Sequence, residues 1–219
     1  EDMDAFAIES LTRAQKAIDE HLNDEEIAPV TISMRQTKKI VSVDEQPHKA
    51  DLERIPLLRP AFASNGTITP ANSSSISDGA SSILLASEQA IKTYELTPKA
   101  RIVAHARNSL APEDFTLAPI GAVEQVLKKA GWSASQVDLW EINEAFAMVT
   151  MLAIRTLELN PFQVNVHGGA CAQGHPIGST GSRIIVTLMY ALKHYGKRRG
   201  VAALCIGGGE ATAIGIELL

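Results

Sequence analysis

Three side chains in the second half of the sequence combine a thiol, an imidazole and an amide. Asn143 follows the apolar run VDLWEI, His175 lies in the glycine-rich stretch GGACAQGHPIGST, and Cys205 ends the apolar run VAALC. Each lies near the carboxyl end of a predicted strand, and in α/β sheets ligands bind beyond such ends. We therefore expect the three on a common edge, where they would suit acyl-transfer or carbon-acid chemistry. The roles would be a nucleophile or base, a proton shuttle and an oxyanion donor.

Taken one at a time, each side chain also has a simpler structural interpretation. His175 could cap a helix or bond a carbonyl group in the core, Asn143 could be an N-cap, and Cys205 could be a small buried apolar group. The glycines around His175 permit positive φ angles and let a ligand approach the backbone. Their spacing after residue 173 is not GxGxxG, and no lysine follows in P-loop position, so a nucleotide fingerprint is not indicated.

Composition limits the classes of function. The chain has 219 residues, is 45% hydrophobic and carries a net charge of -5, which argues against a nucleic-acid binder. Its two cysteines, Cys171 and Cys205, show no zinc spacing, and we expect free thiols in a reducing compartment. The apolar stretch over 145–154 is too short to cross a bilayer, and no signal peptide is recognised. Because Glu1 already lies in a helical pattern, we expect a piece of a longer protein.

The elements that must position these side chains follow from the periodicity of apolar residues. A helix is predicted over 4–18 and two short strands over 26–34 and 38–45. A long polar, proline-dotted loop then leads to a helix over 80–94, with Ser77 or Asp78 as its cap. A loop of that length in a compact protein is functional or disordered, and its apolar residues favour the first.

From residue 97 on, strands and helices alternate. Strands are predicted over 100–110, 137–143, 164–169, 201–209 and 211–219, and helices over 119–132, 144–159 and 181–196. Gly131 is expected to end the first of these helices, and the helix over 144–159 is apolar on most faces and therefore central. This order predicts an α/β layer in which helices flank both sides of a mixed sheet.

In this order and spacing, the stretches NEAFA, GGACAQGHPIGSTGSR and ALCIGGGEA resemble the three C-terminal signatures of the thiolase family. Upstream, DAFAIES, LLRPAF and GTITPANSSSISDGASSILLASE resemble thiolase segments as well, so the resemblance covers essentially the whole chain. It is greatest to the acetoacetyl-CoA type. The resemblance implies the layered thiolase fold, with residues 1–76 as the C-terminal part of a CoA-binding loop domain, 77–97 as a closing segment of the first core domain, and 98–219 as the second core domain.

The resemblance also implies roles for individual residues. His175 resembles the histidine that activates the nucleophile and donates to the thioester oxygen, and Asn143 resembles the asparagine that holds a water in that oxyanion hole. Cys205 resembles the cysteine that moves a proton on or off the α-carbon of the acyl group. The N–H of Gly207 would serve a second oxyanion hole. The residues implied to contact CoA are Ser74, Phe62, Leu58, Ala145 and Phe146.

The implied reaction is the Claisen condensation of two acetyl-CoA molecules to acetoacetyl-CoA and CoA, or the reverse thiolysis. A complete thiolase is longer, and its acyl-accepting cysteine lies in the first half, which neither Cys171 nor Cys205 matches. The resemblance therefore implies a C-terminal half that is inactive alone and needs its N-terminal half. It further implies a homo-oligomer, dimer or tetramer, in the cytoplasm or an organelle matrix. CoA thioesters are its substrates, without a metal or other cofactor, and neither nucleic acid nor a membrane is a partner.

The chain departs from the family pattern at residues 47–49, which read Pro-His-Lys where an arginine often meets the adenine or phosphate end of CoA. Lys49 could supply a point charge but not a bidentate or stacked contact. Two other interpretations remain open: a non-catalytic CoA-binding or scaffold module of thiolase fold, and a Cys–His hydrolase that uses Cys205 and His175. The presence of Asn143 beside that pair favours the enzyme, because a degenerate module has little need of all three.

Overall fold

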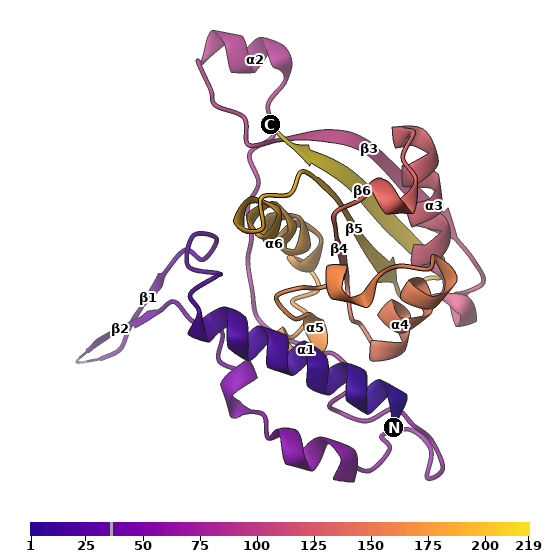
Figure 1. Cartoon of the computed structure of the whole chain (residues 1–219). Coiled ribbons are helices and arrows are strands. Elements are labelled where there is room, and N and C mark those ends of the chain that lie inside the picture. Colours follow the sequence, from indigo (N-terminus) through magenta and orange to yellow (C-terminus); the bar gives the residue numbers. More distant parts are fainter. Residues whose placement is uncertain (36) are drawn as a thin grey trace.

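The C-terminal part of the chain builds a mixed four-stranded sheet. Its strands lie in the order β3 (Ala100–Ser109), β6 (Glu210–Leu218), β5 (Arg199–Ile206) and β4 (Leu139–Ile142). The computed structural model describes residues 1–35 and 37–219 of the chain. β4 and β5 are parallel, whereas β6 is antiparallel to both β3 and β5. This arrangement (Figure 1) confirms the predicted α/β class with a mixed sheet.

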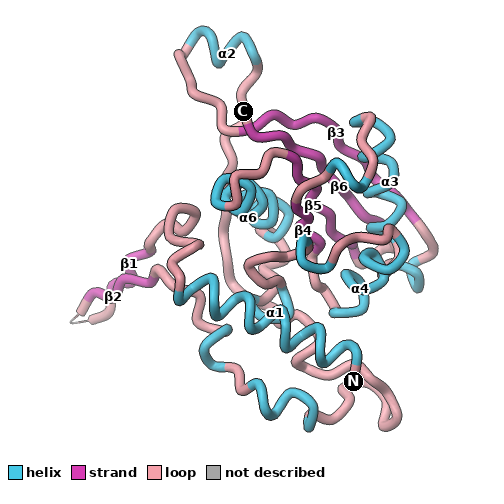
Figure 2. Tube along the Cα trace, viewed as in Figure 1, coloured by secondary structure: helices cyan, strands magenta, loops and turns pink. Residues whose placement is uncertain are grey.

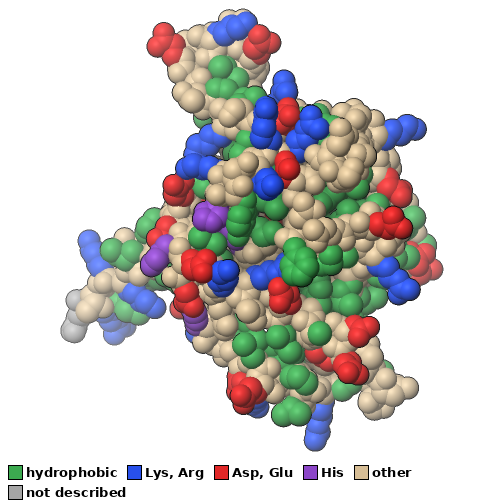
Figure 3. All heavy atoms as spheres, in the orientation of Figure 1, with side chains coloured by type: hydrophobic (Ala, Val, Ile, Leu, Met, Phe, Trp, Pro, Cys, Tyr) green, Lys and Arg blue, Asp and Glu red, His purple; other side chains and the backbone are tan. Residues whose placement is uncertain are grey.

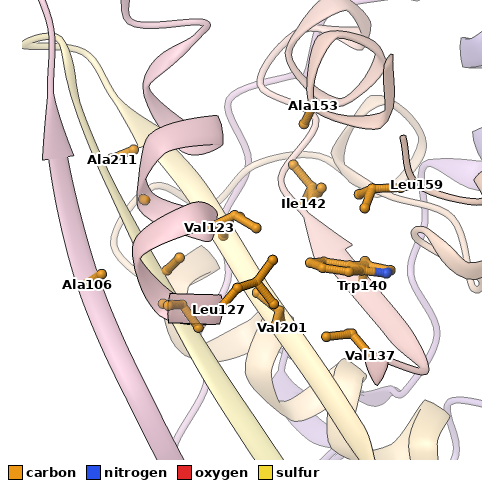
Figure 4. Close-up of a cluster of buried hydrophobic side chains, with 14 of the residues drawn as sticks. Ala106, Val123, Leu127, Val137, Trp140, Ile142, Ala153, Leu159, Val201 and Ala211 are labelled. Carbon is orange, nitrogen blue, oxygen red and sulfur yellow. The ribbon is translucent and has the colours of Figure 1, made fainter. Parts of the chain in front are cut away.

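Helices cover both faces of this sheet. α3 (Ala118–Ala130) and α4 (Ala147–Thr156) pack on one face, and α6 (Thr180–His194) packs on the other (Figure 1). Successive side chains of a strand point to opposite faces, so Leu139 joins the cluster around α6, whereas Trp140 lies in the cluster around α3 (Figure 4). Trp140 is only 1% exposed, and burying a large apolar side chain stabilises the fold by about 1.5–3 kcal/mol.

The N-terminal part consists of one long helix, a hairpin and extended chain. α1 (Asp2–Asp19) packs against α4 and the short helix α5 (Ala170–Gln173). In the view of Figure 2, α1 lies below the sheet. β1 (Val30–Ser33) and β2 (Lys38–Val41) form an antiparallel hairpin on which Val30, Ile32 and Ile40 are exposed, and hydrophobic side chains are visible on this part of the surface (Figure 3). Two 3-10 turns follow in this part, Pro47–Lys49 and Leu52–Leu57, and three more lie in the C-terminal part, Pro112–Asp114, Ala134–Gln136 and Pro161–Gln163. Leu11 and Ala14 of α1 form a small core with Ile55 and Ala172, which holds α1 against α5 and the 3-10 turn Leu52–Leu57.

Several local expectations are confirmed. α1, the hairpin strands, β3, β5, β6, α3 and α6 all form close to their predicted places. Gly131 follows α3 with φ 68°, the left-handed conformation in which glycine ends helices. Cys171 and Cys205 are both free thiols. Within residues 1–35 and 37–219, no helix has the length and hydropathy needed to span a membrane.

The predicted helix over 80–94 is wrong for its first half. Only α2 (Glu88–Thr93) is helical, and its cap is Ser87, whose hydroxyl accepts from the Ala90 N–H at 3.1 Å, rather than Ser77 or Asp78. Leu84 and Leu85 are 84% and 71% exposed. Short helices depend on packing of an apolar face, and this segment has no such support in the described part of the chain.

The predicted strand over 164–169 is also wrong. Val164 forms one isolated bridge to Trp140, and the chain then leaves the sheet. Asn165 has φ 48°, outside the strand region, and its side chain takes the place of a further backbone pair. Its Oδ1 accepts from the Ile142 N–H and its Nδ2 donates to the Ile142 carbonyl, both at 2.8 Å.

α4 is shorter than the predicted helix over 144–159. Phe146 precedes it with φ −137° and forms an antiparallel bridge to Ser73, and the Ala147 N–H donates to the carbonyl of Asn72. At the other end, Glu158 has φ 53°, which the helix cannot contain. Residues 143–146 therefore form an extended loop over the end of the sheet, and contacts with segment 72–76 hold it there.

Candidate active site

Asn143 lies directly beyond the carboxyl end of β4. Its N–H donates to the Ala203 carbonyl at 2.9 Å, which extends the parallel ladder between β4 and β5 by one residue. The side chain is 2% exposed, and its Nδ2 lies 3.5 Å from Nε2 of His175. Its Oδ1 is buried and has no hydrogen-bond partner among the described residues. Asn143 therefore offers one donor toward the imidazole and one acceptor without a partner.

Backbone contacts hold His175 at the same end of the sheet. Gly174 precedes it with φ 84°, and a Cβ at that glycine would lie 2.1 Å from Ser77 Oγ. The His175 N–H donates to the Ser75 carbonyl at 2.9 Å, and His175 forms a parallel bridge with Ile76. Glycine at 174 is thus required by the close crossing of the segment over 75–77.

Thr180 fixes the tautomer of the His175 ring. The Thr180 hydroxyl lies 2.6 Å from His175 Nδ1 and donates its own hydrogen to the Pro176 carbonyl at 3.0 Å. The hydroxyl must therefore accept from Nδ1–H, which leaves the lone pair on Nε2, the atom facing Asn143. Burial, and secondly the charge of Arg183, lower the pKa of His175. The neutral ring consequently presents a base at Nε2.

Cys205 lies one residue before the end of β5 and is 7% exposed. Burial raises the pKa of its thiol. No hydrogen bond joins Cys205 to Asn143 or His175 within residues 1–35 and 37–219, although all three lie toward the same end of the sheet. Gly207 follows in the exposed turn between β5 and β6, where an added Cβ would meet no heavy atom within 4 Å.

The residues that resemblance assigns to CoA fall into two groups. Ser74 is paired with Ala145, because its N–H and its hydroxyl both donate to the Ala145 carbonyl, at 3.1 and 3.0 Å. Phe146 follows Ala145 and packs its ring edge-on to Phe115. Phe62 is exposed and Leu58 is half-buried in the preceding loop. Lys49 is exposed and lies 3.6 Å from Glu45.

The structure brings three further residues to this region: Thr180, Asn165 and Glu144. Sequence reasoning did not single out the first two, and for Glu144, at the end of a predicted strand, it favoured an N-cap over a site group. Glu144 is 1% exposed and follows Asn143 directly, and Asn165 is 2% exposed. The only local signal for Thr180 is a hydroxyl residue at the start of the helix that follows His175. Nothing local indicates Asn165, because its partners lie 23 residues away in the sequence.

Two charged residues, Glu141 and Arg183, are close to Asn143 and share a small cavity with it. Burial raises the pKa of Glu141 well above its ordinary range, and the neighbouring Glu144 adds to this. The positive charge of Arg183 in α6 opposes this rise, and its Nη1 donates to the Gly174 carbonyl at 2.9 Å. A cavity of about 10 Å³ lies between Glu141, Asn143 and Arg183, close to the lower limit for one water molecule.

Two clefts of about 560 and 450 Å³ are lined in part by residues of α1, and neither is lined by Asn143, His175 or Cys205. Around the candidate site, Ile76 and Ile177 are instead 90% and 70% exposed. In the described part of the chain, no group of three His, Cys, Asp or Glu residues could hold a metal ion. Exposed apolar residues therefore lie beside His175, whereas Asn143 and Cys205 are themselves buried.

Comparison with known proteins finds close relatives for the whole chain. It is 47% identical over 220 residues to the probable acetyl-CoA acetyltransferase of Dictyostelium discoideum, covering 100% of this chain and 53% of that protein. It is 43% identical to the mitochondrial acetyl-CoA acetyltransferase of Rattus norvegicus, covering 100% and 52%. The chain therefore spans about half the length of the curated relatives it matches.

Solved structures agree. The acetyl-CoA acetyltransferase of Bacillus anthracis superposes with a TM-score of 0.95 at 39% identity, over 99% of this chain and 55% of that one. A thiolase of Ascaris suum in complex with coenzyme A gives 0.88 at 41% identity, again over 99% and 55%. The profile of the thiolase C-terminal domain matches residues 96–218, and that of the thiolase N-terminal domain matches residues 1–89. With both profiles matched and the same layered fold, this chain belongs to the thiolase family.

Proposed function

We propose that this chain is the C-terminal portion of an acetyl-CoA C-acetyltransferase, which condenses two acetyl-CoA molecules to acetoacetyl-CoA and CoA or catalyses the reverse thiolysis. The observation that carries this proposal is the pair formed by His175 and Asn143, with Nε2 and Nδ2 3.5 Å apart and the proton of the ring held on Nδ1 by Thr180. The relatives named as acetyl-CoA acetyltransferases support the choice of reaction.

In this proposal His175 Nε2 takes the proton of the acyl-accepting thiol. The imidazolium formed then donates a hydrogen bond to the thioester oxygen. Asn143 Nδ2 faces the same point, and its side chain would hold a water that completes this oxyanion hole. Preorganised donors of this kind stabilise the developing oxyanion without reorganisation during the reaction.

Cys205 serves as the acid and base at the α-carbon. Because burial raises its pKa, the resting form is the thiol, and in thiolysis it first donates a proton to the carbon of the departing enolate. The thiolate left behind then removes the proton of the incoming CoA thiol, which restores Cys205. The N–H of Gly207 donates to the second oxyanion.

The acyl-accepting nucleophile is assigned to a further portion of the enzyme and not to Cys171. Burial raises the pKa of the Cys171 thiol well above its ordinary range, with Glu144 adding to the effect, and the thiol donates to the Glu144 carbonyl at 3.7 Å. A nucleophilic cysteine needs the opposite, a lowered pKa and access to substrate. The isolated chain is therefore expected to be inactive.

The same proposal divides the chain into 1–76 as part of a loop domain, 77–97 as a closing segment of the first core domain, and 98–219 as the second core domain. The exposed Leu84 and Leu85 support it, because an extended segment with bare apolar side chains suits strand pairing within another domain. We assign the N-terminal portion and further copies of the enzyme, as dimer or tetramer, as its partners. Relatives named as cytosolic and mitochondrial support the cytoplasm or an organelle matrix as its location.

CoA would lie along the exposed residues beside segment 72–76. Ser74 and Ala145 would contact the pantetheine, and Phe146, Phe62 and Leu58 would provide apolar walls. The Ascaris suum relative with bound coenzyme A supports this ligand. Lys49 is the cation proposed to act at the phosphate end of CoA in place of an arginine.

The test uses two proteins: the isolated chain, and a fusion in which the chain replaces the matching portion of the Dictyostelium discoideum relative. Thiolysis of acetoacetyl-CoA should be absent in the first and present in the second, and His175→Ala in the fusion should abolish it. Turnover by the isolated chain that is lost in Cys171→Ala or Cys205→Ala would contradict the assignment of the nucleophile. A fusion that binds CoA without turnover would favour the non-catalytic module instead.

A further inference from the structure

We propose that Glu144 is a positioning residue, whose buried carboxylate fixes the loop that carries His175 and joins that loop to α1. The proposal deepens the proposed function and rests on it for the role of His175. It concerns how the loop is held, and the structure gives four contacts that bear on this.

The carboxylate of Glu144 accepts hydrogen bonds from three separate segments. Oε2 accepts from the Ser10 hydroxyl at 2.7 Å and from the Cys171 N–H at 3.1 Å, and Oε1 accepts from Asn165 Nδ2 at 2.8 Å. Ser10 in turn accepts from the Gly169 N–H at 2.9 Å. The start of the glycine-rich loop is therefore bonded directly to Glu144 and, through Ser10, to α1.

The ionised carboxylate accepts from every one of these partners. Burial is the dominant influence and raises the pKa of Glu144, and the hydrogen bonds from Asn165, Ser10 and Cys171 to the charged form oppose this rise. A proton on Oε1 would face the NH2 group of Asn165, which has no acceptor to offer. Asn165 cannot turn its amide to help, because its Oδ1 and Nδ2 are both bonded to the backbone of Ile142.

The loop backbone packs directly on this carboxylate. A Cβ at Gly169 would lie 2.4 Å from Glu144 Oε1, and a Cβ at Gly168, which has φ 79°, would lie 2.5 Å from the Ser10 carbonyl. These glycines let the chain lie against Glu144 and α1 without a side chain between them. Larger residues would push the loop away from both.

The contacts of Glu144 affect the positions of both His175 and Asn143. Glu144 is the neighbour of Asn143 in sequence, and the Cys171 N–H that it binds lies within α5, the short helix that ends just before Gly174 and His175. The far end of the same loop is held by Arg183, which donates to the Gly174 carbonyl. With one end released, the loop would be free to shift relative to Asn143.

The test compares Glu144→Gln, Ser10→Ala and the control Glu124→Gln, which makes the same chemical change at an exposed position of α3. Glutamine has the shape of glutamate, but its NH2 must face either the Asn165 amide or the Cys171 N–H. Amide hydrogen exchange at Gly169 and Cys171 and the NMR titration of the His175 ring are measured in the isolated chain. We expect exchange at Cys171 about tenfold faster or more in Glu144→Gln, with a smaller increase in Ser10→Ala.

The His175 titration separates a positioning role from general support of the fold. Because burial lowers the pKa of His175 and Arg183 is the charged group that acts on it, a loosened loop should move the pKa upward in both variants and not in Glu124→Gln. Variants that lower the melting temperature but leave the titration and the exchange unchanged would overturn the proposal. If Glu144→Gln fails to fold, Ser10→Ala decides alone.

Turnover is a separate measurement, made in the fusion protein. There Glu144→Gln should lower kcat about tenfold or more, with KM changed less than kcat, because ground-state contacts to CoA remain. A fusion protein without activity would refute the proposed function, whereas the exchange and titration results in the isolated chain would still stand or fall by themselves.

Discussion

Replacing Thr180 with valine should lower the pKa of His175 and let its neutral ring change tautomer. Thr180 is 0% exposed, and its hydroxyl oxygen lies 2.6 Å from His175 Nδ1 while it donates to the Pro176 carbonyl. Valine has nearly the same shape as threonine. The substitution therefore removes one acceptor from the ring with little change in packing.

The size of the effect follows from the two forms of the ring. A hydrogen bond from a charged donor contributes about 1.5–3 kcal/mol, and one between neutral groups about 0.5–1.5 kcal/mol. The loss therefore falls more heavily on the imidazolium, by roughly 1–1.5 kcal/mol, which is about one pKa unit. The shift adds to the lowering that burial and Arg183 already cause. In the neutral ring, part of the population would move its proton to Nε2.

The assay is an NMR titration of the His175 ring in the isolated chain, with nitrogen chemical shifts to report the tautomer. Thr180→Ser is the matched control, because it keeps the hydroxyl and should titrate like the wild type. In the fusion protein, Thr180→Val should also lower kcat by about 10- to 100-fold, since general base catalysis contributes about 10²–10⁴-fold. A valine variant whose pKa is unchanged or raised, with the proton still on Nδ1, would refute the assignment of Thr180 as acceptor.

The other predictions concern stability. Burial, and secondly His194, lower the pKa of His167 from 6.5 to about 4, so the folded state binds fewer protons than the unfolded state. Stability should therefore be complete above pH 6.5 and fall by about 3 kcal/mol toward pH 4, and urea titrations of His167→Gln at several pH values should show a flatter dependence. Burial raises the pKa of Glu26 from 4.5 to about 7, so here the folded state binds more protons than the unfolded state. The free energy of unfolding therefore falls as the pH rises through that range. Glu26→Gln should consequently stabilise the chain at pH 8 by about 1–3 kcal/mol, and no gain over pH 5 would contradict this. Gly209 has φ 93°, and an added Cβ would lie 2.5 Å from the Leu110 carbonyl. Gly209→Ala should therefore cost about 1–3 kcal/mol in thermal unfolding, whereas Gly181→Ala, with open space around it, should not.

Much of the fold could be predicted because its local patterns are strong. The apolar periodicities of α1, α3 and α6 and the apolar runs of β3, β5 and β6 each allow one kind of element, and Gly131 ends its helix as glycine does at a left-handed position. Asn143 could be singled out because it follows an apolar run in an alternating α/β order, and His175 because it lies in a glycine-rich stretch. The sequence motifs were also sufficient to identify the family.

Other features depend on contacts that no local pattern contains. The segment over 80–87 is not helical, because its apolar side chains find no surface in this chain, and the strand expected over 164–169 ends at Asn165, whose amide bonds the end of β4 instead. Thr180 is assigned as the acceptor of the His175 ring only through the distances around it.

Glu144 is the clearest example of a residue whose role could not be predicted from the sequence. Its sequence neighbours indicate only a polar residue at the end of a strand, as they do for an N-cap. Its partner Ser10 lies 134 residues away, and Asn165 lies 21 residues away. A buried carboxylate is stable only when donors surround it, and which donors reach it is decided by how α1, the glycine-rich loop and β4 pack together. The sequence by itself thus determined which elements form and which residue types could do chemistry, whereas the tertiary structure decided which polar groups meet.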